Sequence, residues 1–99
     1  MFGRRNEKTI ESAIREAVRR SDLGMFEKLW VQLVLTVFPQ AMEHLKSTVM
    51  EAANADMAMG LVDVNAIISP DQWEKIIDFF IENILPILLE LLKGLIGGL

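Results

Sequence analysis

Residues 69–98, SPDQWEKIIDFFIENILPILLELLKGLIGG, decide the fold of this chain. Ser69 and Gln72 match the capping box that begins many helices, and Pro70 stands at the first helical position, where its missing N–H costs nothing. The pattern predicts one long final helix over residues 70–96, ended by the glycines that follow.

The apolar surface of this predicted helix widens along its length, and we expect Pro86 to bend it. Before Pro86 the apolar arc covers roughly 140°, and after Pro86 it covers roughly 200°. A small domain seldom has enough polar cover to surround such a helix, so part of this surface is expected to form an interface. The predicted interface residues are Leu88, Leu91, Leu92, Leu95 and Ile96, with Glu90 and Lys93 at the rim.

Residues 9–20 predict a short amphipathic helix. Thr9 is a suitable N-cap, and apolar residues recur at spacings of three and four. These apolar positions are Ile10, Ala13, Ile14, Ala17 and Val18. The stripe is narrow, so the helix must dock on another element to bury it.

Residues 24–38 are mostly apolar and fit two structures. As a helix they carry one apolar face, formed by Phe26, Leu29, Trp30, Leu33, Val34, Val37 and Phe38, opposite Lys28, Gln32 and Thr36. The β-branched residues from Val31 to Val37 favour a strand instead. We predict the helix, because the chain offers no second strand of comparable quality to pair with it. Trp30 and Trp73 both lie on predicted apolar faces, so we expect them in the core.

Pro39 marks the turn into a further helix over residues 40–59. Its predicted inner side chains are Met42, Leu45, Val49, Ala52, Ala53 and Met57. We expect Gly60 to end this helix as a left-handed cap. Residues 61–68 then link it to the final helix, with Ile67 and Ile68 turned inward.

The composition limits the chain to one small globular domain. Its 99 residues are 52% apolar and 24% charged, which excludes a disordered tail. The absence of cysteine excludes a disulfide scaffold and a thiolate metal site. We predict an all-α fold, a small four-helix bundle over residues 1–99, with a flexible basic N-terminus at 1–8 and a frayed C-terminus at 97–99.

The charge is unevenly distributed along the chain. Residues 1–22 carry six basic against four acidic side chains, whereas residues 23–99 carry four lysines against ten acids. We expect no nucleic-acid binding, because residues 23–99 are acidic and binding to the phosphate backbone requires many cationic side chains that displace its counterions. The basic end offers Arg4, Arg5, Lys8, Arg15 and Arg19 for contact with an anionic surface. The first residues do not resemble a signal peptide, so we expect a cytoplasmic protein, at most peripheral to a membrane.

The sequence carries no motif of catalysis or cofactor binding. It lacks a glycine-rich phosphate loop, a serine-centred elbow and the spacing of a zinc site. Glu43, His44 and Glu51 share a predicted helix, but the di-iron pattern needs Glu and His three residues apart on each of two helices. We expect no enzyme activity, no cofactor, no metal and no small-molecule substrate.

These patterns predict a non-enzymatic interaction or assembly protein that works by helix packing. The expected partner is a second copy of the chain, contacted through the last helix, or another helical protein. The alternative is a peripheral membrane-associated helical protein, such as a small virion-associated or lysis-type component, whose last helix lies in the bilayer interface.

Overall fold

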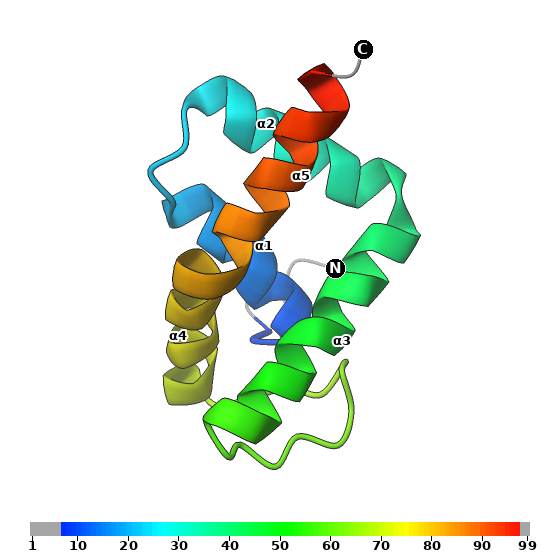
Figure 1. Ribbon diagram of the computed structural model, residues 1–99. Helices are drawn as coiled ribbons and strands as arrows, with labels where there is room; N and C mark the ends of the chain where they lie inside the picture. The colour runs from blue at the N-terminus through cyan, green and yellow to red at the C-terminus, as the bar shows by residue number, and fades with distance from the viewer. Residues whose placement is uncertain (1–6, 98–99) are drawn as a thin grey trace.

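The protein is an all-α helical bundle. The computed structural model describes residues 7–97 and, for side chains, residues 7–94, and no strand occurs among them. The elements in chain order are α1 (Ile10–Arg20), α2 (Met25–Val37), α3 (Pro39–Asp56), α4 (Pro70–Phe79), the π-helical η2 (Phe80–Ile84) and α5 (Leu85–Gly97). The last three follow one another without a break and form the predicted final helix (Figure 1). The helical interpretation of residues 24–38 is confirmed.

The short helix α1 is the centre of the bundle. It contacts α2, α3, α4 and η2, and Figure 1 shows it in blue between α4 and α3. All five residues of its predicted apolar stripe are buried. The predicted cap is confirmed, because the N–H of Ser12 donates to Thr9 Oγ1 at 3.3 Å and the N–H of Thr9 donates to Ser12 Oγ at 2.9 Å.

Side chains from the other helices and from the link before α4 complete one core around α1. Its buried members outside α1 are Val31, Leu35, Met42, Leu45, Val49, Ile68, Ile76, Ile77, Phe80, Leu85 and Leu92. Trp73 is half-buried at the edge of this core, where its indole N–H donates to Ser12 Oγ at 2.9 Å. That bond fixes the first turn of α4 to the first turn of α1.

The helix α3 ends earlier than predicted, and Gly60 does not end it. Its last helical residue is Asp56, and the left-handed conformation after it belongs to Ala58, with φ 51°. Gly60 also has a positive φ, 69°, but it lies in the following loop. The reason is a side-chain clamp: the amide of Asn54 accepts from the N–H of Leu61 at 2.7 Å and donates to its carbonyl at 2.8 Å, which turns the chain back early.

The link between α3 and α4 turns only one of its two isoleucines inward. Ile68 is buried, and its N–H donates to the carbonyl of Lys8 at 2.7 Å. Ile67 is 66% exposed, so its predicted burial was wrong. Neighbouring side chains outside a helix point in different directions, and only one of this pair can face the core.

The final helix begins as predicted but is not uniform. Ser69 Oγ accepts from the N–H of Gln72 at 3.2 Å, and Gln72 Oε1 accepts from the N–H of Ser69 at 3.2 Å. In η2 the N–H of Leu85 bonds five residues back, to the carbonyl of Phe80. The widened turns come directly before Pro86, whose ring would clash with a carbonyl four residues earlier in a regular helix. In Figure 1 α4 and α5 follow different directions on the two sides of η2.

Candidate functional site

Among the side chains that the structure describes, those of residues 7–94, the most extensive row of exposed apolar residues lies on α2. Its members, which we call the α2 face, are Met25, Phe26, Leu29, Leu33, Val37 and the adjoining Phe38. Each exposes between 52% and 80% of its area. At 100° per residue, the five members within the helix fall in an arc of about 120°. A row of large apolar side chains left in water on one helix is typical of a binding surface.

The orientation of α2 reverses what the sequence suggests. The apolar face predicted for residues 24–38 exists, but most of it points to solvent, and the buried residues are Val31 and Leu35. Polar side chains turn the helix this way. Gln32 Nε2 donates to the carbonyl of Arg15 at 3.2 Å, and Lys28 Nζ donates to the carbonyl of Arg19 at 2.8 Å.

Trp30 is half-buried beside the α2 face, with its ring against the core. Its indole N–H is enclosed and has no acceptor among the described residues. An enclosed donor without a partner costs about 1–3 kcal/mol. Trp30 therefore packs against the core without being fully buried in it, and no described residue accepts from its indole N–H.

The residues of the interface predicted on α5 differ in how far they are buried. Leu92 is only 7% exposed and belongs to the core, so little of its surface is left for an interface. Leu88 is half-buried and Leu91 is 64% exposed. Glu90 and Lys93 are exposed. The side chains of Leu95 and Ile96 lie outside the described residues.

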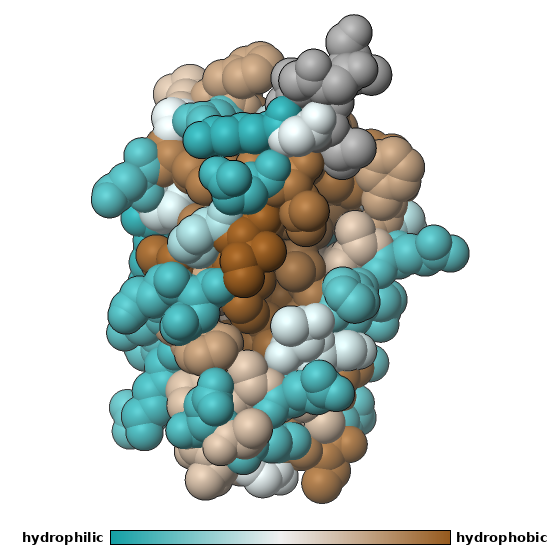
Figure 2. Space-filling view, in the orientation of Figure 1, coloured by the Kyte–Doolittle hydropathy of each residue, from teal (hydrophilic) through white to brown (hydrophobic). Residues whose placement is uncertain are grey.

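A small apolar groove runs between α5 and α3. It has a volume of about 180 Å³ and is lined by His44, Leu45, Thr48, Ile84, Ile87, Leu88 and Leu91. Figure 2 shows it as brown surface between the two helices, with hydrophilic residues in teal on both sides. Ile87 is not among the predicted interface residues, but it is 63% exposed, about as much as Leu91 at 64%.

A second pocket, of about 470 Å³, lies beside Trp73 and is lined mainly by charged and polar side chains. Of the cations predicted to meet an anionic surface, it gathers Lys8, Arg15 and Arg19, whereas Arg4 and Arg5 fall outside the described residues. The three cations have partners within the chain. Lys8 Nζ lies 4.6 Å from the centroid of the Trp73 ring, Arg15 donates to Gln32 Oε1 at 3.2 Å, and Arg19 pairs with Glu16 at 2.6 Å.

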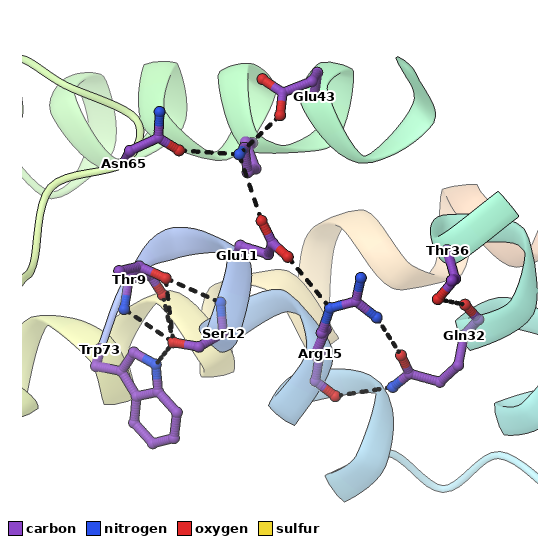
Figure 3. A network of polar contacts seen from close by, with 10 residues as sticks. Thr9, Glu11, Ser12, Arg15, Gln32, Thr36, Glu43, Asn65 and Trp73 are labelled. Atoms are coloured by element: carbon purple, nitrogen blue, oxygen red, sulfur yellow. Dashed lines mark hydrogen bonds and ion pairs between the residues drawn. The ribbon is translucent and has the colours of Figure 1, made fainter. Parts of the chain in front are cut away.

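One lysine is buried in a polar network, shown in Figure 3. Lys46 is 4% exposed, and its ammonium lies 2.8 Å from Glu43, 3.5 Å from Glu11 and 3.0 Å from the amide oxygen of Asn65. Burial opposes the charge of Lys46, but the two carboxylates outweigh burial and raise its pKa above 10.5. These partners come from α1, α3 and the link before α4, so the network ties three segments together.

The structure shows no metal-binding cluster in the part of the chain that it describes. Glu43 is paired with Lys46, and His44 is exposed beside the apolar groove. Among residues 7–97, no helix combines the length and the apolar character that crossing a bilayer requires.

Comparison with protein-family models, with curated proteins and with solved structures finds no match to this chain. The candidate site therefore rests on geometry alone. It consists of the α2 face and, on α5, Ile87 and Leu91 beside the groove.

Proposed function

We propose that this chain is a non-enzymatic interaction protein that self-associates by helix packing. The observation that carries the proposal is the set of large apolar side chains on α2 and α5 that the subunit leaves exposed. Burying apolar surface is worth about 25 cal/mol per Å², so leaving it in water is unfavourable unless a partner covers it.

The charged residues support a protein partner. Ion pairs cover α1 and α4 on the outside: Glu16 accepts from Arg19 and Arg20, and Arg20 pairs with Glu74 at 2.8 Å. By contrast α2 carries two charged residues, Glu27 and Lys28, both in its first turns. Depletion of charge around an apolar centre is the compositional mark of a protein interface.

Light scattering in solution tests the proposal. At tens of micromolar we expect a mass above the 11.2 kDa of one chain. The double variant Leu29→Glu, Leu91→Glu should return the mass to one chain, because it places a charge in each exposed apolar surface. Ala55→Glu is the control, since it adds one glutamate at an exposed position near the far end of α3, outside both surfaces. A wild-type protein that stays monomeric at this concentration contradicts the proposal.

Binding to a membrane surface is the alternative use of the same side chains. An interfacial helix normally carries cations beside its apolar face. The one lysine of α2 donates to the carbonyl of Arg19, which leaves that face without a cation of its own. Co-sedimentation with anionic vesicles separates the two functions: salt-sensitive binding that Leu29→Glu abolishes, by a protein monomeric in solution, favours the membrane.

A further inference from the structure

We infer that the α2 face is the contact between two copies of this chain, with α2 of one copy packed antiparallel on α2 of the other. The inference rests on the proposed function and makes it specific, because it names the surface, the partner and the direction of packing. The occupant is a second copy of this chain, related by a two-fold axis that crosses the contact at the level of residue 31 along the helix.

The exposed area suits a dimer. Six large side chains, each more than half exposed, present on the order of 600 Å² of apolar surface per copy. Stable interfaces bury roughly 600–1,000 Å² on each partner, so the α2 face approaches that size by itself. The groove between α5 and α3 holds only about 180 Å³ and, among the side chains described up to residue 94, has two that are apolar and strongly exposed, Ile87 and Leu91. It is too small to be the main contact.

Four of the six residues of the α2 face are arranged symmetrically along the helix. A two-fold axis at residue 31 brings Leu29 opposite Leu33 of the second copy and Met25 opposite Val37 of the second copy. All four are exposed and apolar, so each meets an apolar partner. An isologous interface requires such self-complementarity, because one patch must serve on both copies.

The charges of α2 favour the antiparallel direction. Glu27 is the exposed charge of the helix, and its carboxylate accepts from the N–H of Gly24 at 3.1 Å. Antiparallel packing separates the two Glu27 positions by about 12 Å along the axis, more than the screening length of about 8 Å at physiological salt. Parallel packing would place them side by side. Antiparallel helix dipoles also attract one another.

The absence of cysteine makes cross-linking a clean test. We would prepare three single-cysteine proteins, Leu29→Cys, Leu33→Cys and Leu91→Cys. Leu91 is the matched control for Leu29, because both leucines are 64% exposed. Unfolding curves would first establish that each variant is folded.

The expected result is a disulfide-linked dimer in an oxidised mixture of Leu29→Cys and Leu33→Cys, formed at least about tenfold faster than the Leu91→Cys dimer. A bound partner holds the second thiol at a millimolar effective concentration, whereas collision depends on the micromolar protein. The mixed product should also exceed the product of either variant alone, since the axis places residue 29 opposite residue 33.

Other results overturn the inference in distinguishable ways. Fastest cross-linking at Leu91→Cys in an oligomeric protein refutes the α2 dimer but leaves the proposed self-association intact. Self-linked products that exceed the mixed product refute the antiparallel direction. Slow cross-linking of all three variants in a protein that is monomeric by mass refutes both proposals.

Discussion

The helices α1 and α2 are neighbours of similar length, yet they meet water in opposite ways. Every apolar residue of the α1 stripe is buried, and its outer surface carries ion pairs. In α2 only Val31 and Leu35 are buried, and five large apolar residues face solvent: Met25, Phe26, Leu29, Leu33 and Val37. The difference shows that apolar content alone does not decide which side of a helix enters the core. In α2 the buried side is the one whose polar residues, Lys28 and Gln32, reach hydrogen-bond partners on α1.

The two phenylalanines at residues 80 and 26 give the largest expected contrast. Phe80→Ala should lower the free energy of unfolding by about 3–5 kcal/mol, because Phe80 is fully buried in the core around α1. Phe26→Ala should change the stability of the subunit by about 0.5 kcal/mol or less, because Phe26 is 77% exposed. Urea unfolding at a protein concentration low enough to dissociate oligomers measures both, and similar losses for the two variants would remove the contrast.

The hydrogen bonds between Gln32 of α2 and Arg15 of α1 should contribute an intermediate amount to the free energy of unfolding. Gln32→Ala removes the bond to the Arg15 carbonyl and the bond from the Arg15 guanidinium, so we expect a loss of about 1–2 kcal/mol. Hydrogen exchange should show amides of α2 opening faster while those of α4 keep their protection. The control is Thr36→Ala, whose hydroxyl bonds only within its own helix. An unchanged exchange rate in Gln32→Ala would mean that the bonds between Gln32 and Arg15 do not orient α2.

Replacing each tryptophan by phenylalanine should change the stability less, and it compares an indole N–H that has an acceptor with one that has none among the described residues. Trp73→Phe keeps most of the ring but loses the bond to Ser12, so stability should fall by about 1 kcal/mol. Trp30→Phe removes a donor that has no acceptor among the described residues, so stability should stay level or rise. Thermal unfolding of both variants checks the order, and a larger loss at Trp30 would contradict it.

The smallest expected effect is on pH dependence. The hydrogen bond from Arg20 lowers the pKa of Glu74, and for Glu16 the bonds and charges of Arg19 and Arg20 outweigh burial and also lower the pKa below 4.5. Because both pKa values are lower in the folded state, their stabilisation is present above pH 4.5 and is lost as the pH falls below it. Glu74→Gln should flatten the decline in unfolding midpoint in this acidic range, and an unchanged slope would show that the pair with Arg20 contributes nothing.

Much of the fold could be predicted because its strongest signals are local. The stripe of α1, the cap at Thr9 and the cap at Ser69 need only neighbouring residues, and all three are confirmed. The end of α3 could not be predicted, because it depends on the clamp between Asn54 and Leu61 across a loop. The π-helical turns of η2 also escaped prediction, although Pro86 pointed to an irregularity nearby.

The candidate site was predicted only in part. Apolar residues cover most of the circumference of α2, so periodicity could not say which side would remain exposed. The answer depends on Lys28 and Gln32 reaching carbonyls of α1. On α5 the arc is wider than the core can cover, and sequence could not separate the buried Leu92 from the exposed Leu91.

Sedimentation equilibrium over a dilution series tests the central claim most directly, with Leu29→Glu and Leu91→Glu compared with the wild-type protein. We predict a wild-type dimer that Leu29→Glu weakens at least about thirtyfold, as loss of an interface hot spot of about 2 kcal/mol would, and that Leu91→Glu leaves nearly unchanged. A wild-type protein that is monomeric at every concentration, or a dimer that Leu91→Glu dissociates and Leu29→Glu does not, would contradict the account.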